Sequence, residues 1–286
     1  MTAAILELVK TLLLDAITSI DSMIANAAEV LSGGGGVTDI WYQIVSLSNI
    51  LKPFCNIVIA ICLLIEIAQV AAKVDIIKWE HGLKLCVKMA LAKVAIDVAP
   101  TFLRACYNQA TLWINGLGAP SLSLGSLVST TTIETLLDGV TGLGGAIGLL
   151  ASCLLLIMAI KICGLVVQVI AYGRIFEIYV YLLVSPLPMA FFPLGNGNGD
   201  GISRITSRFI KSFIAVCLQG VMILVVMRIF SSICGTAIAN AVAEAGTAGG
   251  SVGVTNLCYA LLMGCVVLVM SVAKCGSWAK GIIDAM

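Results

Sequence analysis

Charged side chains are scarce in this 286-residue chain. Only 11% of the residues are Asp, Glu, Lys or Arg, whereas 60% are hydrophobic and the mean hydropathy is +1.10. A water-soluble domain needs far more charge to cover its surface, so the composition predicts a membrane protein. The formal net charge of +1 also excludes a strongly basic surface made to coat nucleic acid.

The usual sequence signatures of catalysis and metal binding are missing as well. The chain has a single histidine, His81, and it has no C-x-x-C pair, G-x-S-x-G elbow, Walker loop or H-E-x-x-H motif. Its eleven cysteines lie mostly inside apolar segments, which is typical of small buried thiols and not of disulfides or zinc ligands. We therefore expect no enzymatic activity, no metal and no cofactor.

Long apolar runs predict an all-α fold, a polytopic transmembrane helical bundle. Backbone groups in hydrocarbon must be hydrogen-bonded within their own segment, and a spanning helix needs roughly 20 apolar residues. The runs predict about five spans and one Pro-broken segment, either re-entrant or a short sixth span, which contains Pro186, Pro188 and Pro193. Gly144 and Gly148 have the G-x-x-x-G spacing of closely packed membrane helices. The predicted segments are 53–72, 88–114, 143–171, 175–194 (the Pro-broken one), 208–230 and 256–272.

The N-terminal segment, residues 1–36, is predicted to be an extracytoplasmic domain that precedes the transmembrane domain, 37–286. Between residues 2 and 31 the apolar side chains recur on one helical face, and a glycine-rich hinge follows. The opposite face carries mostly acids: Glu7, Lys10, Asp15, Asp21 and Glu29. Because helices that bind anionic lipid are instead rich in Lys and Arg, we expect the apolar face to pack against partner subunits. An anchor in the membrane interface is the alternative.

The basic residues between the predicted spans predict the orientation of the chain in the membrane. Five lysines lie between residues 73 and 93, and three basic residues lie at 204–211, whereas the stretches 115–141 and 231–255 contain no Lys or Arg. Cytoplasmic loops hold the excess of Lys and Arg. The counts therefore predict a multi-pass protein of a bacterial cytoplasmic membrane, with its N terminus outside and its C terminus inside.

Ionisable residues within the predicted spans are the candidate functional groups. They are Glu66, Lys93, Asp97, Arg104 and Lys161, and helical spacing places Lys93, Asp97 and Arg104 in one polar stripe. Each is costly in lipid, so we expect these side chains to face protein or water. Proton relays use such groups, but paired charges that fix helix packing give the same pattern, and we favour the structural interpretation. Lys161 has the best claim to a functional role, although it can also snorkel to the cytoplasmic side or pair with Glu66.

The most distinctive segment is 173–220, which reads GRIFEIYVYLLVSPLPMAFFPLG, a polar loop and then SRFIKSFIAVCLQG. It resembles the TrbL-type polytopic inner-membrane subunits of conjugative type IV secretion systems, the sixth VirB component class. The size and the Cys-rich spans are more similar to the versions carried by mobile elements of Gram-positive bacteria. The matching residues are Arg174, Glu177, Ser185, Pro186, Pro188, Ala190, Lys211, Phe213, Ala215, Cys217 and Gln219.

This resemblance implies a function in DNA transfer. Members of the family oligomerise around a central axis, contact secretion ATPases and other membrane and extracytoplasmic subunits, and help to pass single-stranded DNA with its attached relaxase. The resemblance therefore implies a homo-oligomer in membrane lipid that transiently contacts the translocating DNA. A secondary transporter or small channel, with Glu66, Asp97 and Lys161 along its substrate path, is the second hypothesis.

Overall fold

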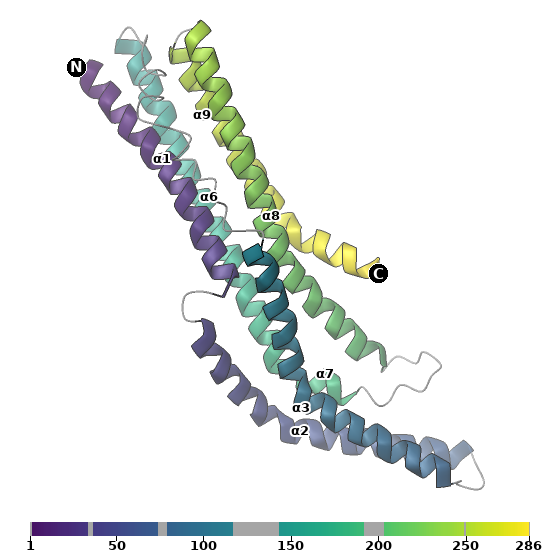
Figure 1. Cartoon of the computed structure of the whole chain (residues 1–286). Helices are drawn as coiled ribbons and strands as arrows, with labels where there is room; N and C mark the ends of the chain where they lie inside the picture. Colours follow the sequence, from purple (N-terminus) through teal and green to yellow (C-terminus); the bar gives the residue numbers. More distant parts are fainter. Residues whose placement is uncertain are drawn as a thin grey trace. The chain divides into compact units, whose positions relative to one another are not determined.

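The chain folds into long α-helices, and the part that the structure describes contains no strand. The computed structural model describes residues 2–33, 37–73, 79–116, 143–191, 203–248 and 250–285. The helices are α1 (Thr2–Leu31), α2 (Val37–Lys73), α3 (Trp79–Gly116), α6 (Leu143–Val184), the short α7 (Pro186–Ala190), α8 (Ser203–Ala248) and α9 (Gly250–Asp284) (Figure 1). The predicted all-α membrane fold is confirmed.

Four of these helices are long and apolar enough to cross a membrane. The candidate spans are Ile40–Ile65, Gly144–Ala190, Ile205–Ala241 and Gly253–Asp284. The predicted span 88–114 is not among them, because Lys88, Lys93, Asp97 and Arg104 lower the hydropathy of α3. Four of the predicted spans therefore lie in helices that can cross a membrane, among the residues that the structure describes.

The helices are much longer than the apolar runs that predicted them. For example, α6 has 42 residues, about 63 Å at 1.5 Å per residue, whereas the hydrocarbon core of a bilayer is about 30 Å thick. The predicted break near residue 171 is wrong, because α6 continues to Val184. The predicted first span, 53–72, lies within the longer helix α2, which also includes Pro53. Hydropathy marks only the part of a helix that suits lipid, and a membrane helix tolerates proline.

The chain does break at the predicted prolines, and the polar groups at the break are satisfied. The helical hydrogen bonds of α6 end at Ser185, whose Oγ donates to the Leu182 carbonyl at 2.8 Å. Pro186 and Pro188 are buried in α7, and the Pro188 carbonyl accepts a hydrogen bond from Thr206 Oγ1 of α8 at 2.7 Å. The segment is thus buried in protein, as a broken helix at membrane depth requires. Pro193 lies outside the described residues.

Two compact units make up the chain. Unit 1 consists of Met1–Ser32, Trp113–Gly173 and Gly220–Ser277. Its core joins α1 to the neighbouring parts of α6, α8 and α9, and in Figure 1 α1 runs alongside α6. Leu13, Ala16, Ile20 and Ala27 of α1 are almost completely buried in this core. The apolar face of α1 therefore packs against helices of its own chain, not against partner subunits or a membrane interface as expected.

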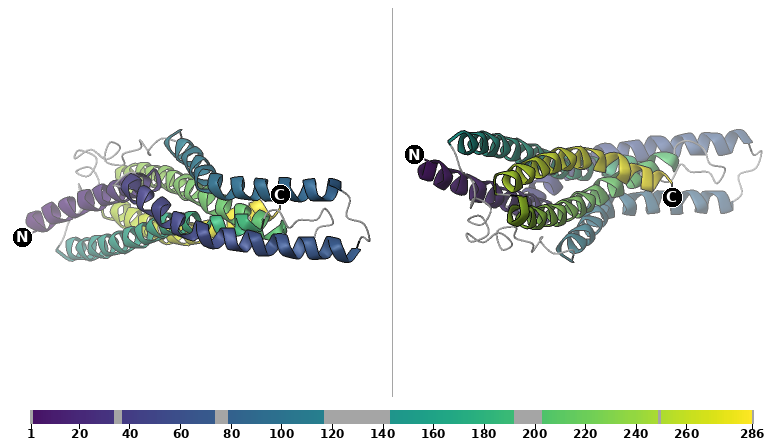
Figure 2. Two further views of the ribbon diagram at one scale, coloured as in Figure 1. Left: turned by 90° about the horizontal axis from the view of Figure 1, so that it is seen from below. Right: turned by 90° about the horizontal axis from the view of Figure 1, so that it is seen from above.

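Unit 2 consists of Gly33–Leu112, Arg174–Gln219 and Trp278–Met286. In it α2 and α3 form a helical hairpin, and Figure 2 shows these two helices running alongside each other. A small core of Cys55, Ile59, Ala92, Ile96 and Ala99 joins the two helices to α7. Tyr181 of α6 contacts the rings of Phe209 and Phe213 of α8, at centroid distances of 5.5 and 6.1 Å. Aromatic contacts therefore hold α6 against α8 in this unit.

Close packing between helices occurs at glycines other than the predicted ones. Among the described residues, no atom lies within 4 Å of a Cβ built at Gly144 or at Gly148. A Cβ at Gly164 would lie 3.3 Å from Met23 Cγ, and one at Gly264 would lie 3.1 Å from Phe230 Cε2. Gly164 and Gly264 therefore allow the close approach of helices within unit 1. The predicted packing role of Gly144 and Gly148 is not seen inside the described chain.

Candidate functional site

In unit 1, Lys161 is joined to the N-terminal helix. Its Nζ donates a hydrogen bond to Ser19 Oγ of α1 at 2.7 Å and lies 3.9 Å from Asp15 Oδ2. The side chains of Lys161 and Asp15 are each 57% exposed, so the pair is a surface ion pair of the unit and not a buried one. The sequence suggested Glu66 as a partner, but the side chain of Glu66 is not among those that the structure describes.

A small polar cavity continues from Lys161 along the seam between α1 and α6. Its volume is about 200 Å³, and its polar lining comprises Ser19, Ser22, Asn26, Lys161 and Gln168. On α1 these residues follow Asp15 at spacings of three or four, so they lie along one edge of the helix. The seam thus joins the two helices through polar groups, beside the apolar contacts of the core.

In unit 2, the predicted stripe of Lys93, Asp97 and Arg104 faces α2. Asp97 Oδ1 lies 3.4 Å from Lys52 Nζ. The guanidinium of Arg104 lies over the rings of Trp41 and Tyr42, at 5.1 and 5.9 Å from their centroids. Such cation–π contacts satisfy a charge without an acid. The structural interpretation of Asp97 and Arg104 is therefore favoured, because both bind partners on the neighbouring helix.

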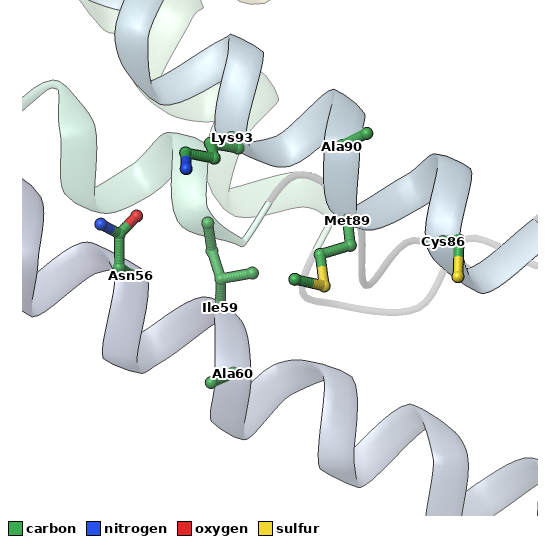
Figure 3. A pocket seen from close by; sticks show the side chains of 7 residues that line it. All are labelled: Asn56, Ile59, Ala60, Cys86, Met89, Ala90 and Lys93. Carbon is green, nitrogen blue, oxygen red and sulfur yellow. The ribbon is translucent and has the colours of Figure 1, made fainter.

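Lys93, the third member of the stripe, lines a cavity between α2 and α3. The cavity has a volume of about 490 Å³, and Figure 3 shows Lys93 and Asn56 reaching into it from opposite helices above Ile59. The other lining residues are Ala60, Cys86, Met89 and Ala90. This cavity is mainly apolar and carries one cationic group at its end.

Segment 173–220, which carries the family resemblance, contains the polar residues Arg174, Glu177 and Gln219. Arg174 donates to Glu177 one helical turn later, so these two residues of the family resemblance form an intrahelical ion pair. Gln219 is only 2% exposed, and its Nε2, like the Nε of Arg174, has no hydrogen-bond partner among the described residues. Buried donors without partners are rare, so these two groups are exceptions among the described residues of unit 2.

Sequence reasoning missed several of the partners that the structure supplies. Lys52 and Asn56 were not chosen as site residues, although their spacing of four places them on the same helical face. Asp15 was assigned to the polar face of α1 and Ser19 was not considered, because no sequence signal relates that helix to α6. Thr206, which caps the proline break, carries no recognisable signal. Tertiary contacts alone revealed these residues.

The cysteines are mostly buried, and the described residues form no metal site. All cysteines except Cys86 and Cys106 are buried. Cys153 Sγ of α6 lies 3.9 Å from Cys258 Sγ of α9, which is a packing contact in the core of unit 1. Within the described ranges no group of three or more His, Cys, Asp or Glu residues is placed to hold a metal ion.

Comparison with known proteins gives two family matches. Two family models, each described as TrbL/VirB6 plasmid conjugal transfer like protein, match residues 19–186 and 109–286. Each match covers more than half of the chain, and the two overlap in the region that contains Lys161 and Arg174. No curated protein and no solved structure matches the chain.

Proposed function

Because the chain belongs to the TrbL/VirB6 family of plasmid conjugal transfer proteins, and is thus a multi-pass membrane component of a type IV secretion system, we propose that it forms part of the transfer channel itself. In this role it supports the passage of single-stranded DNA with its relaxase. It acts as a scaffold and not as an enzyme. Copies of the chain assemble with one another and with secretion ATPases and extracytoplasmic subunits.

The observation that carries this proposal is the outer face of α1. On α6, the exposed side chains of Leu155, Met158, Ile162, Leu165 and Val169 form an apolar stripe that suits lipid. On α1, which packs along this part of α6, the exposed stripe is instead polar. It consists of Glu7, Thr11, Thr18 and Glu29, and of Asp15, Ser22 and Asn26 along its edge towards α6.

A polar stripe whose charged residues are all acidic needs protein or water opposite it when it lies beside lipid-exposed helices. Carboxylates are expensive in hydrocarbon, so α1 cannot face lipid tails along its length. An acidic surface also repels the phosphates of DNA. We therefore propose that α1 faces neighbouring subunits around the channel and that it does not bind the DNA.

The charge of the two units supports the proposed orientation. Unit 2 contains every Lys and Arg of the chain except Lys10, Lys161, Arg228 and Lys274. By the positive-inside rule, the basic stretches 73–93 and 204–211 belong to the cytoplasmic side of a bacterial cytoplasmic membrane, where the ATPases act. Lys274 and Lys280 near the C terminus support an inside C terminus.

Deleting the gene in frame from its mobile element is expected to abolish conjugation. The channel lacks a membrane component in that strain, so the number of transconjugants per donor should fall to the background of the mating assay. A copy supplied in trans should restore transfer and so exclude effects on neighbouring genes. Unchanged transfer in the deletion strain would refute the proposed role.

Photo-crosslinking from α1 tests the contact with other subunits. A photoreactive amino acid at Ala25, on the exposed face of α1, is expected to give protein adducts in donor cells, which mass spectrometry can identify. The matched position is Met158, which is 64% exposed on the apolar stripe of α6 and should give adducts with lipid. Lipid adducts from both positions would show that α1 is not a subunit contact.

A further inference from the structure

The cavity between α2 and α3 follows a regular antiparallel helix pairing. Lys52 of α2 pairs with Asp97 of α3, and one turn further along both helices Asn56 lies opposite Lys93. Figure 3 shows the ammonium of Lys93 and the amide of Asn56 directed towards the same space. Lys93 therefore lies one helical turn from Asp97 on the same face of α3. It faces the amide of Asn56 and not an acid.

The positive charge of Lys93 has no counter-charge in this cavity. None of the residues that line the cavity is acidic. No ion pair joins Lys93 to another described residue, and the neighbouring Asp97 lies 3.4 Å from Lys52 Nζ. An amide oxygen can orient an ammonium but cannot neutralise it. The site thus provides one cation and one hydrogen-bonding amide at the end of an apolar cleft.

The surroundings of the cavity are those of a lipid-facing surface. Ile57, Ile61 and Leu64 of α2 are exposed, and so are Val87 and Leu91 of α3. Exposed apolar side chains of this density on a membrane hairpin are covered by acyl chains. A molecule that enters the cleft from this side must therefore be amphiphilic. Its charged group has to be an anion.

We propose that this cleft is a binding site for an anionic phospholipid. The phosphate lies against Lys93 and Asn56, and the first part of an acyl chain lies over Ile59, Ala60 and Met89. A cleft of about 490 Å³ has the size of an ordinary small-molecule site, which falls between about 300 and 1,000 Å³. Basic pockets between helices on the cytoplasmic side of a membrane are suited to anionic head groups. This proposal does not depend on the role in conjugation.

Cys86 provides a native probe for the occupied cleft. It lines the cavity, and it is the cysteine that is exposed in the described chain. Its labelling by a maleimide can be followed in the purified full-length protein by mass spectrometry of the peptide that contains it. Phosphatidylglycerol is expected to slow labelling by a factor of 1 + [L]/Kd, which is about tenfold at a lipid concentration roughly ten times Kd. Phosphatidylcholine and inorganic phosphate should not slow it.

Three variants test the part played by the charge. Lys93→Gln should lose the protection by phosphatidylglycerol, and Lys93→Arg should keep it. Lys211→Gln removes another exposed lysine of unit 2 and should behave as the wild type. Equal protection by phosphatidylcholine, or protection that persists in Lys93→Gln, would overturn the proposal. Protection by inorganic phosphate alone would replace the lipid with a free anion.

The lipids that copurify with the wild-type protein give a second measurement that needs no variant. Native mass spectrometry of protein extracted from a mixed membrane is expected to show one anionic phospholipid retained in preference to zwitterionic lipids. Retention in proportion to the membrane composition would contradict a specific site. The result therefore decides the proposal even if a substitution at Lys93 impairs folding.

Discussion

Replacing Ala27 with aspartate is expected to release α1 from unit 1 and to lower the stability of the protein by about 3–5 kcal/mol, the range for an uncompensated buried charge. Ala27 is 0% exposed and lies in the core that α1 shares with α6, α8 and α9. A carboxylate at this position enters a cluster of buried hydrophobic residues and must either be buried there or expel the helix. A fall in the midpoint of thermal unfolding in detergent, and faster proteolysis of the N-terminal segment, would report the loss.

The matched control for Ala27→Asp is Ala25→Asp. Ala25 lies on the same helix, two residues away, but its side chain is exposed. The same substitution there adds the same charge and the same helix propensity without burying the carboxylate. We expect the unfolding midpoint of the isolated Ala25→Asp protein to stay near that of the wild type. Equal destabilisation by both substitutions would mean that α1 is not packed in the core as described.

Gly264→Leu is expected to destabilise the contact between α8 and α9 by about 1–3 kcal/mol, the usual cost of overfilling a packed core. Even a Cβ at this position would lie 3.1 Å from Phe230 Cε2, and Phe230 is itself buried in the core of unit 1. A leucine side chain therefore has to displace the ring or separate the helices. The unfolding midpoint in detergent measures this effect.

Gly148→Leu is the control for the leucine side chain itself. Gly148 is exposed on α6, and no described atom lies within 4 Å of a Cβ built there. Leucine also favours a helix more than glycine does, so the stability of the isolated protein should be unchanged or slightly higher. If Gly148→Leu instead reduced transfer without reducing stability, the predicted packing role of Gly144 and Gly148 would apply between subunits. A loss of stability equal to that of Gly264→Leu would contradict the structure.

Lys93, Asp97 and Arg104 have different roles because each of them faces a different group on α2. The Lys93, Asp97 and Arg104 stripe was predicted as one feature from its spacing, and all three residues do face α2. They nevertheless have separate environments: Asp97 meets Lys52, Arg104 meets two aromatic rings, and Lys93 meets an uncharged cleft. Helical periodicity determines the face of a side chain. It carries no information about the residue on the opposite helix.

A short segment of the sequence was enough to predict the family. The resemblance of residues 173–220 to TrbL-type subunits is confirmed by family matches that extend over nearly the whole chain. The prolines that contributed to this resemblance do end α6, although the helix extends ten residues further into the predicted broken segment than expected. The closely spaced Pro186 and Pro188 end a helix because each removes a backbone donor, whereas the single Pro53 lies inside α2 without ending it. The start of a helix has no signal of equal strength.

The sequence by itself determined that this is an all-α membrane protein, because composition and apolar run length depend only on the transfer of side chains and backbone into lipid. It also determined the amphipathic character of α1 and the helical face of each intramembrane charge. Only the tertiary structure decided what those faces contact. The burial of Ala27, the Lys161–Asp15 pair and the cleft at Lys93 each join segments that are far apart along the chain, and the pairing of such segments depends on the complementary shapes of whole helices.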